Sequence, residues 1–421
     1  MEKLQSTEVI FFFLQVMLLL FFAKLFGVIF RLIKLPVVAG ELVGGIILGP
    51  TIFGYFMPLS FHTLFFSQPK ATIALSGIFN VSVIFMLFIA GLEIKMPVLL
   101  KNTRNALIIS LSGTVIPFAA GFSLGWFGFH AFNMTNESIH LLFALFLGSA
   151  LSITSLPVLS KILLDLDLLS KNIGTLLITS ASFGDFAGWM LFSAVLALFP
   201  GNTTQKNFPV VVMILLALLF AVVSLTVFRY VLNYLLKRMG KFFGTDGAIC
   251  LSVVLCLLGA LTTEYIGIHA IFGAFLMGIV IGTSNAFNQA SKQIIKRFVY
   301  SVFVPIFWIS LGLRVNFITS FDISIFILMF SAGLFSKVIG GFIGAKLAGL
   351  NNRVSIGTGL SIHAYGSMEI ILGLIALQAG IINEQMFVAM ISMSVISTFT
   401  AGFFIKKFFV ENSFTLGVEP Q

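Results

Sequence analysis

The sequence has few charged residues and few cysteines. Only 9% of its 421 residues are Asp, Glu, Lys or Arg, whereas a soluble protein contains roughly 25%. So little charge cannot cover a water-exposed surface, which excludes a soluble globular fold. The two cysteines, Cys250 and Cys256, lie six residues apart in one apolar block and do not face each other on a helix. Neither a disulfide nor a metal site is therefore indicated.

Motifs of ATP-driven transport and of enzymes are also missing. The sequence has no P-loop, no GxGxxG motif, no metal-ligand spacing, no Ser/His/Asp arrangement and no paired catalytic carboxylates. We therefore expect no enzyme activity and no cofactor. The net charge of +9 comes from short basic clusters between apolar blocks. This distribution favours contact with membrane lipid over binding of nucleic acid.

Hydrophobic residues dominate the chain, at 59% of the total, with 50 phenylalanines. They form about 13 blocks of about 20 to 27 residues, the length of a helix that crosses a bilayer. Transmembrane β-strands would be about 10 residues long with alternating polarity, and that pattern is absent. The sequence therefore predicts an all-α membrane protein with about 13 transmembrane helices.

Basic residues predict how the chain is oriented. Lys and Arg gather after the odd-numbered blocks, as at Lys237, Arg238 and Lys241, and are sparse after the even-numbered ones. By the positive-inside rule, the N-terminus lies outside and the C-terminus lies in the cytoplasm. We expect a multi-pass protein of the cell (inner) membrane.

The blocks can be paired into two halves with an offset of seven. Because the offset is odd, the halves have opposite orientations, which is the inverted-repeat plan of many secondary transporters. The predicted transmembrane domain, residues 1–410, divides into three parts, followed by a short cytoplasmic tail. Repeat one covers about 8–199, a linker helix about 208–236, repeat two about 245–410, and the tail 411–421.

Blocks five and twelve correspond in this pairing, and polar residues interrupt both. Ser152–Pro157 breaks the first, and His363–Ser367 breaks the second. A proline removes a backbone donor and frees a carbonyl. Matched interruptions predict two broken helices that cross at a substrate site near the bilayer midplane.

Asp185 is the main candidate for transport chemistry. It lies about 12 residues into the sixth block, or roughly 18 Å along a helix, with no charged neighbour. Ser182 lies on the same helix face. One carboxyl group that holds either a proton or a monovalent cation is a minimal exchanger. The alternative is a structural aspartate neutralised by a partner. The hydroxyls and freed carbonyls of Thr154 and Ser152 offer further cation ligands.

Four other polar residues in the apolar blocks are candidates for the site. Lys337, near the middle of block eleven, could compensate the charge of Asp185 or release its own proton, although a lysine can also snorkel to an interface. Glu369 could line a cavity or cap a half-helix. His363 could sense pH, but a hydrogen-bonded structural histidine is the alternative. Tyr365 accompanies His363 in the second interruption.

The chain resembles a known family over nearly its whole length. The resemblance is carried by the stretches Leu35–Glu41 with Gly49-Pro50, Met86–Glu93, Ser152–Leu163, Ile268–Leu276 and Ile309–Arg314. They are similar to the monovalent cation/proton antiporter superfamily, in the branch of Kef-type, NapA-like and plant cation/proton exchangers. The most specific is Ser152–Leu163.

The resemblance implies an NhaA/NapA-like fold of 13 helices with a dimerisation domain, a mobile elevator-like core and a homodimeric assembly. It implies that Asp185 matches the ion- and proton-carrying aspartate, that Lys337 matches the core lysine, and that Thr154 lies in the first broken helix. The chain departs from the family at Gly184, where Asn or Asp is usual, and at Tyr365, where plant-like members often have Arg.

These observations lead to one hypothesis and three competitors. We expect electroneutral exchange of Na⁺ or K⁺ for H⁺ centred on Asp185, because Gly184 leaves the site without a second carboxylate. A sodium-coupled symporter of an organic solute would need a larger polar cavity. A non-transporting membrane sensor is favoured only by the departures from the family pattern at Gly184 and Tyr365. A membrane enzyme lacks any supporting motif.

Overall fold

The computed structural model describes residues 5–32, 37–93, 103–168, 171–198, 209–267, 269–284, 287 and 289–411. These residues form helices and no strands, which confirms the predicted all-α class. The helices group into two compact units, each built from two separate segments. Unit 1 comprises Met1–Ile94 and Lys206–Ser320, and unit 2 comprises Lys95–Gln205 and Phe321–Gln421.

The apolar blocks become membrane-length helices. Within the described part of the chain, nine helices are long and apolar enough to cross a membrane. Three shorter apolar helices cover Glu137–Ser152, Ala270–Gly282 and Met368–Gln378. A multi-pass membrane protein is therefore confirmed, whereas the number of about 13 spans stays a prediction.

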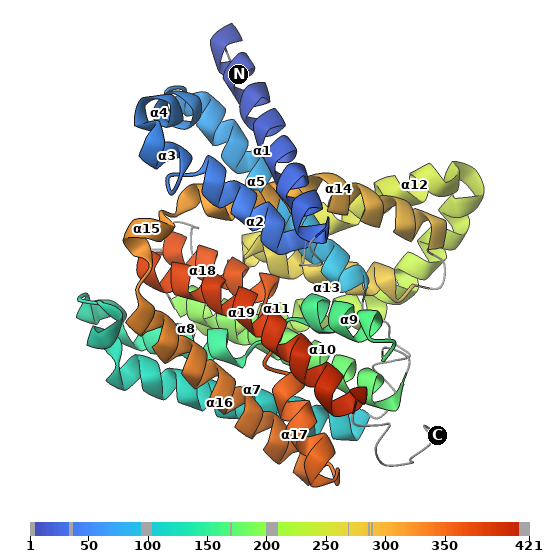
Figure 1. Cartoon of the computed structure of the whole chain (residues 1–421). Coiled ribbons are helices and arrows are strands. Elements are labelled where there is room, and N and C mark those ends of the chain that lie inside the picture. Colours follow the sequence, from blue (N-terminus) through green and yellow to red (C-terminus); the bar gives the residue numbers. More distant parts are fainter. Residues whose placement is uncertain are drawn as a thin grey trace. The chain divides into compact units, whose positions relative to one another are not determined.

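Unit 1 contains the first five helices and the helices of the chain's middle part (Figure 1). They are α1 (Ser6–Leu32), α2 (Val37–Leu48), α3 (Phe53–Phe56), α4 (Pro58–Phe66), α5 (Pro69–Leu92), α11 (Val210–Val223), a π-helical turn (Ser224–Phe228), α12 (Arg229–Ile266), α13 (Ala270–Gly282), α14 (Gln289–Arg314) and α15 (Phe317–Ser320). In this unit α5 packs on α13 and α14, and α2 packs on α1 and α14. A break inside α12 at Gly244, where φ is 62°, separates the predicted linker block from the next block.

Glycines bring α5 and α13 into close contact. A Cβ atom at Gly91 would collide with the backbone oxygen of Phe275, and one at Gly278 would collide with that of Phe88. Small residues let helix backbones approach each other, as is common in membrane proteins. The α5–α13 pair therefore depends on the absence of side chains at these positions.

Unit 2 contains the two helices that the sequence predicts to be broken. Its elements are α7 (Thr103–Phe127), the 3-10 turns η1 (Phe129–Phe132) and η2 (Glu137–Ile139), α8 (His140–Ser152), α9 (Leu156–Asp165), α10 (Asn172–Leu198), α16 (Ile323–Leu347), α17 (Asn352–Ser361), α18 (Ser367–Gln378) and α19 (Glu384–Phe409). Here α7 packs on α8, α10 and α16, while α19 packs on α16, α17 and α18. The broken helices are therefore held between unbroken ones.

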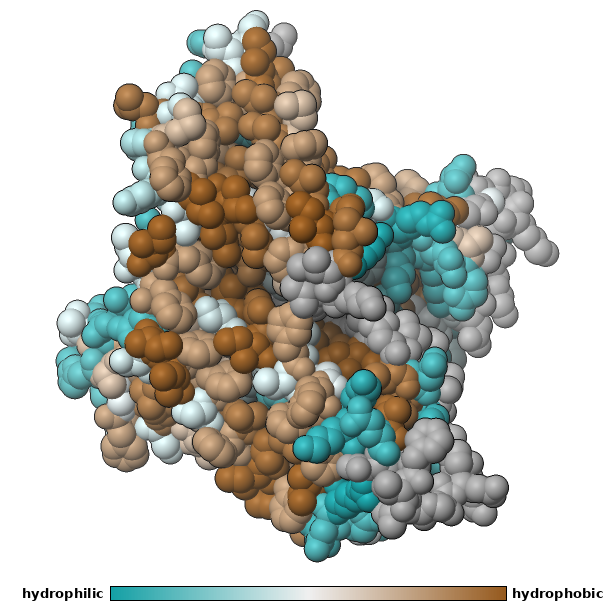
Figure 2. Space-filling model, in the orientation of Figure 1, coloured by the Kyte–Doolittle hydropathy of each residue, from teal (hydrophilic) through white to brown (hydrophobic). Residues whose placement is uncertain are grey.

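Large apolar side chains are exposed on the outer helices of both units. Phe13 of α1 is 65% exposed and Phe403 of α19 is 60% exposed. Figure 2 shows that hydrophobic residues cover most of the visible face. An apolar exterior of this kind suits a helix surface in contact with lipid tails.

Glycine packing in unit 1 gives a first prediction. Gly91→Ala should lower the stability of the detergent-solubilised protein by about 1–3 kcal/mol, because the added methyl group overpacks the α5–α13 contact. Gly77→Ala, on the same helix, is the matched control, since its Cβ atom meets nothing within 4 Å. It should raise stability slightly through helix propensity. Equal thermal unfolding temperatures for the two variants would contradict the packing described here.

Candidate functional site

The two helices of unit 2 are interrupted where the sequence predicts. α8 ends at Ser152, Ile153 is extended with φ −78° and ψ 143°, and the chain turns helical again at Leu156. Pro157 follows in the first turn of α9, where a proline is tolerated. In the second helix, α17 ends at Ser361 and α18 begins at Ser367. Both interruptions are thus confirmed.

The two interruptions are bonded directly to each other. Three hydrogen bonds connect them: Ser155 N to Ala364 O at 2.8 Å, Thr154 Oγ1 to Ile362 O at 2.9 Å, and Tyr365 Oη to Leu151 O at 3.0 Å. Backbone groups that leave a helix inside a membrane need partners within the protein. The interruptions supply these partners to each other, so each one stabilises the other.

Asp185 lies beside the first interruption. It is 0% exposed, and its Oδ2 accepts a hydrogen bond from Leu156 N, the first residue of α9, at 3.3 Å. Its Oδ1 is buried without a hydrogen-bond partner among the described residues. The positive end of a helix dipole favours a negative charge there. The arrangement thus leaves one carboxylate oxygen for a proton or a cation.

The ammonium group of Lys337, on α16, also lies beside the first interruption. Its side chain is 1% exposed, and its Nζ donates to Gly113 O at 3.1 Å, to Thr154 Oγ1 at 2.8 Å and to Ser152 O. All three acceptors are neutral. Among the described residues no ion pair joins Lys337 to Asp185, and the ammonium binds the broken helix instead. Snorkelling of Lys337 is also not observed.

A small cavity adjoins the Lys337 contacts. It has a volume of about 10 Å³, close to what one water molecule needs. Hydroxyl-bearing residues Ser110, Thr114, Thr154 and Ser180 line it, together with Gly184. A Cβ atom at Gly184 would lie 3.6 Å from Ser110 Oγ and 3.7 Å from Thr114 Oγ1. Because Gly184 has no side chain, the cavity stays open next to these two hydroxyl groups.

The other predicted site residues have separate partners. Ser182 Oγ donates to Ile178 O at 2.8 Å and makes no bond to Asp185. His363 is fully buried between Leu360 O at 2.5 Å and Thr400 Oγ1 at 2.7 Å, which supports its structural interpretation. Glu369 lies in the first turn of α18 and is not among the residues that line the cavity.

Several groups at the site were missed by reasoning from the sequence. The N–H of Leu156 belongs to the backbone and carries no residue-type signal. The free carbonyl of Gly113 does have a signal, because Pro117, four residues later in α7, lacks the N–H that would bond it. Ser110 and Thr114 also carry one: they lie four residues apart on one helix face in a block that contains few other polar residues. Their spacing would have identified α7 as a helix that faces the site.

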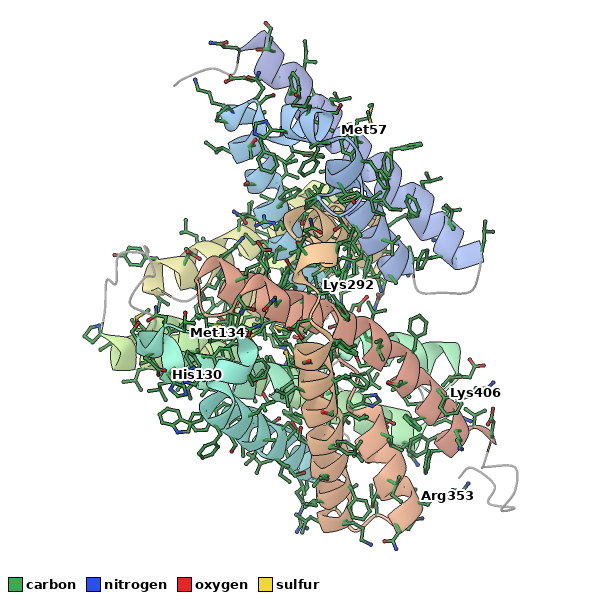
Figure 3. All side chains as sticks on the ribbon, turned by 60° about the vertical axis from the view of Figure 1, so that its left-hand side comes forward. Met57, His130, Met134, Lys292, Arg353 and Lys406 are labelled. Carbon is green, nitrogen blue, oxygen red and sulfur yellow. The ribbon has the colours of Figure 1, made fainter. Side chains whose placement is uncertain are left out.

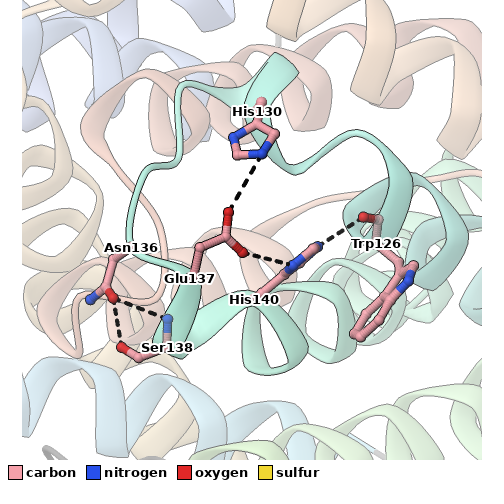
Figure 4. Close-up of polar contacts among 6 residues, drawn as sticks. All are labelled: Trp126, His130, Asn136, Glu137, Ser138 and His140. Atoms are coloured by element: carbon pink, nitrogen blue, oxygen red, sulfur yellow. Dashed lines mark hydrogen bonds and ion pairs between the residues drawn. The ribbon is translucent and has the colours of Figure 1, made fainter.

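A second polar cluster lies at the other end of α8, near its first residue, His140 (Figure 4). The His140 ring lies between Trp126 O, 2.8 Å from Nε2, and Glu137 Oε2, 3.2 Å from Nδ1. Glu137 also approaches His130 Nε2 at 3.5 Å. The cluster lies roughly 18 Å along α8 from Ser152. It fixes the connection between α7 and α8 and takes no part in the site around Asp185.

Comparison with known proteins identifies the family. A family model described as sodium/hydrogen exchanger, transmembrane, matches residues 17–411. The chain therefore belongs to the sodium/hydrogen exchanger family, whose members are membrane transporters, and the resemblance to cation/proton antiporters is confirmed.

Individual relatives agree with this assignment. The chain is 28% identical to the Na⁺/H⁺ antiporter NhaS4 of Synechocystis, with 89% of this chain and 92% of the relative covered. It is 29% identical to cation/H⁺ antiporter 17 of Arabidopsis thaliana, with 92% and 47% covered, and 28% identical to K⁺/H⁺ antiporter 1 of Saccharomyces cerevisiae, with 94% and 46% covered. The chain thus spans about half the length of the plant and yeast relatives.

A solved structure has the same fold. The sodium/proton antiporter MjNhaP1 of Methanocaldococcus jannaschii superimposes with a TM-score of 0.64 over 95% of this chain and 96% of that chain, at 16% identity. The predicted antiporter fold is thereby confirmed.

The bonds of Thr154 give a second prediction. Thr154→Val removes a hydrogen-bond acceptor of Lys337 and leaves Ile362 O without its donor, so stability should fall by about 1–3 kcal/mol. Thr154→Ser keeps the hydroxyl and should restore most of this loss. The measurement is thermal unfolding of the two variants in detergent. A valine variant as stable as the serine variant would show that the hydroxyl bridge contributes nothing.

Proposed function

We propose that the protein exchanges Na⁺ or K⁺ for H⁺ across the membrane, with Asp185 holding the proton and the cation in turn. The single observation that carries this proposal is the fully buried Oδ1 of Asp185, which has no partner in the described part of the chain and lies next to the two bonded interruptions. An ionised carboxylate in such a place is costly unless a cation compensates it. Binding of a proton and binding of a metal cation are therefore mutually exclusive ways to stabilise one group.

The oxygens that would complete a cation shell are already close by. Ser152 O and Thr154 Oγ1 both accept from Lys337, and Ser182 offers a further hydroxyl on the helix of Asp185. A cation that takes the Ser152 and Thr154 oxygens has to displace the ammonium. In this proposal Lys337 therefore holds the site together when the cation is absent and gives up its acceptors when the cation binds.

The relatives support both candidate ions. The names of the Synechocystis and Saccharomyces proteins specify Na⁺ and K⁺ respectively, and selectivity depends on the number and geometry of coordinating oxygens. The small volume of the cavity beside Lys337 suits an ion or a water molecule.

The proposed transport cycle is electroneutral and of the elevator type. Unit 2, which carries Asp185 and both interrupted helices, is the moving part, and unit 1 is the scaffold and the surface of a homodimer. Each unit takes one segment from either half of the chain, as expected for two intertwined inverted repeats. We keep the repeat boundaries near 8–199 and 245–410 as part of this proposal.

The proposed orientation has the N-terminus outside and the C-terminus in the cytoplasm. Figure 3 shows Arg353 and Lys406 at one end of unit 2 and His130 at the other. Basic residues at one end are what the positive-inside rule associates with the cytoplasmic side. This distribution supports the prediction made from the sequence.

The central test is ion exchange in proteoliposomes that contain a pH-sensitive dye. Addition of Na⁺ or K⁺ should move protons for the wild type, and Asp185→Asn should abolish this movement, because an amide neither titrates nor carries charge. Asp322→Asn is the matched control. Asp322 caps α16 by accepting from Ser324 N and Ile325 N, a role that asparagine also fills. Normal exchange by Asp185→Asn would overturn the proposal.

A further inference from the structure

Ser110 and Thr114 are buried hydroxyl residues of α7 that the proposed function leaves without a role. They are 8% and 7% exposed. A helical serine or threonine often donates its hydroxyl hydrogen to the carbonyl one turn back, as Ser112 Oγ of the same helix does to Ile108 O at 2.9 Å. Within the described part of the chain, neither Ser110 Oγ nor Thr114 Oγ1 forms a hydrogen bond. Both residues line the small cavity beside Gly184 instead.

Two further hydroxyl residues line this cavity, and both have already used their hydrogen atoms. Thr154 Oγ1 donates to Ile362 O at 2.9 Å, and Ser180 Oγ donates to Leu176 O at 2.8 Å. A hydroxyl oxygen also has two lone pairs. Thr154 Oγ1 uses one of them to accept from Lys337 Nζ, so one remains. The cavity is therefore lined by two hydroxyl groups that need an acceptor and by two that can still accept.

A single water molecule matches this set of groups. Its oxygen can accept two hydrogen bonds and its hydrogens can donate two, and buried waters make two to four such bonds. The cavity volume of about 10 Å³ is close to what one water needs, whereas cavities that stay empty are apolar. We infer that the cavity is a binding site for one water molecule, which accepts from Ser110 and Thr114 and donates to Thr154 and Ser180.

The chemistry of the lining favours water over a monovalent cation. Among the described residues that line the cavity, none has a carboxyl group that would compensate a positive charge. A cation accepts no hydrogen bond, so the hydroxyl hydrogens of Ser110 and Thr114 would still lack acceptors. The ammonium group of Lys337 is bonded to Thr154 Oγ1 at 2.8 Å, and it would repel a second positive charge in the adjacent cavity.

Gly184 makes the room for this water. A Cβ atom at position 184 would lie 3.6 Å from Ser110 Oγ and 3.7 Å from Thr114 Oγ1, the two groups that donate to the water. The water therefore lies where a side chain at position 184 would begin.

The water also has a consequence for transport, which rests on the proposed function. It gives Thr154 Oγ1 a third partner besides Ile362 O and Lys337 Nζ. When the cation displaces the ammonium, the bonds to Ile362 and to the water stay, so the oxygen keeps its orientation. Ser110 and Thr114 are thus positioning residues for a cation ligand.

The test of the water site is the thermal unfolding temperature of Gly184→Ala in detergent. In a dry cavity the added methyl group would meet only ordinary contacts, and replacement of a helical glycine would raise the unfolding temperature. If the methyl group expels a water, the hydroxyl groups of Ser110 and Thr114 lose their acceptor, and the temperature should fall by about 2–5 °C. Gly402→Ala of α19 is the matched control, because its Cβ atom meets only Ile162, at 4.0 Å. It should raise the temperature.

Further variants separate loss of the water from damage to helix packing. Gly184→Ser places a hydroxyl group beside the same donors and should recover at least about half of the loss. Ser110→Ala combined with Thr114→Val should lower the unfolding temperature of the wild type but not that of Gly184→Ala, where no water is left to lose its donors. All shifts should be equal in NaCl, KCl and choline chloride, since water is present in each.

The transport consequence is measured as exchange in proteoliposomes. In Gly184→Ala the KM for Na⁺ or K⁺ should rise about threefold to tenfold, while the maximal rate stays within about twofold of the wild type. Gly184→Ser should bring the KM back toward the wild-type value, and Gly402→Ala should leave it unchanged. A KM that does not change in Gly184→Ala would overturn the positioning role of Ser110 and Thr114.

Two results would overturn the water site itself. One is a Gly184→Ala variant that unfolds at or above the wild-type temperature, as expected for a dry cavity. The other is a shift that occurs only in NaCl or KCl, which would assign the cavity to a cation. Absence of exchange by the wild type would remove the proposed function, but the unfolding temperatures would still decide whether the water is bound.

Discussion

The burial of one ammonium group among neutral oxygens organises unit 2. A lysine inside the membrane region is expensive, and its cost is offset only where every proton of the ammonium has an acceptor. Lys337 finds these acceptors on α7 and on the first interruption, at Gly113, Ser152 and Thr154. Thr154 then donates to the second interruption at Ile362 O. A single charge therefore ties together four segments that are distant in sequence.

The same constraint explains why the helices are broken. A regular helix uses its carbonyls internally, except where a proline removes the donor, as Pro117 does for Gly113 O of α7. In the same way, the end of α8 leaves Ser152 O available to Lys337 and the beginning of α9 leaves Leu156 N available to Asp185. The interruptions thus create one acceptor for a cation and one donor for an anion within a few residues. The ammonium of Lys337 and the carboxyl group of Asp185 therefore bind different residues of the same interruption.

Much of this arrangement follows from local signals in the sequence. Long apolar blocks indicate an all-α membrane protein. The polar residues around Ser152–Pro157 and His363–Ser367 mark the two interruptions, because such residues are rare in the interior of membrane helices. The depth of Asp185 and Lys337 within their blocks also indicates that they are buried. All of these features depend on residue type and spacing, which are visible without a structure.

The partners of the charged groups could not be predicted in the same way. Leu156 contributes a backbone N–H that every residue except proline has, and Ser182 forms a bond within its own helix rather than one to Asp185. The repeat boundaries, the dimer and the role assigned to Ser182 stay predictions. The absence of a direct Lys337–Asp185 bond depends on where α16 crosses the first interruption, a relation between segments almost two hundred residues apart.

The composition of unit 2 from two distant segments has a consequence for biogenesis. α7 to α10 leave the ribosome well before α16 to α19, because all the later helices of unit 1 lie between them in the chain. During that interval the carbonyl of Ser152, the hydroxyl of Thr154 and the N–H of Ser155 lack the partners that Lys337, Ile362 and Ala364 later supply. The newly made first half must therefore remain in contact with water, the insertion machinery or a chaperone until the last third of the protein arrives.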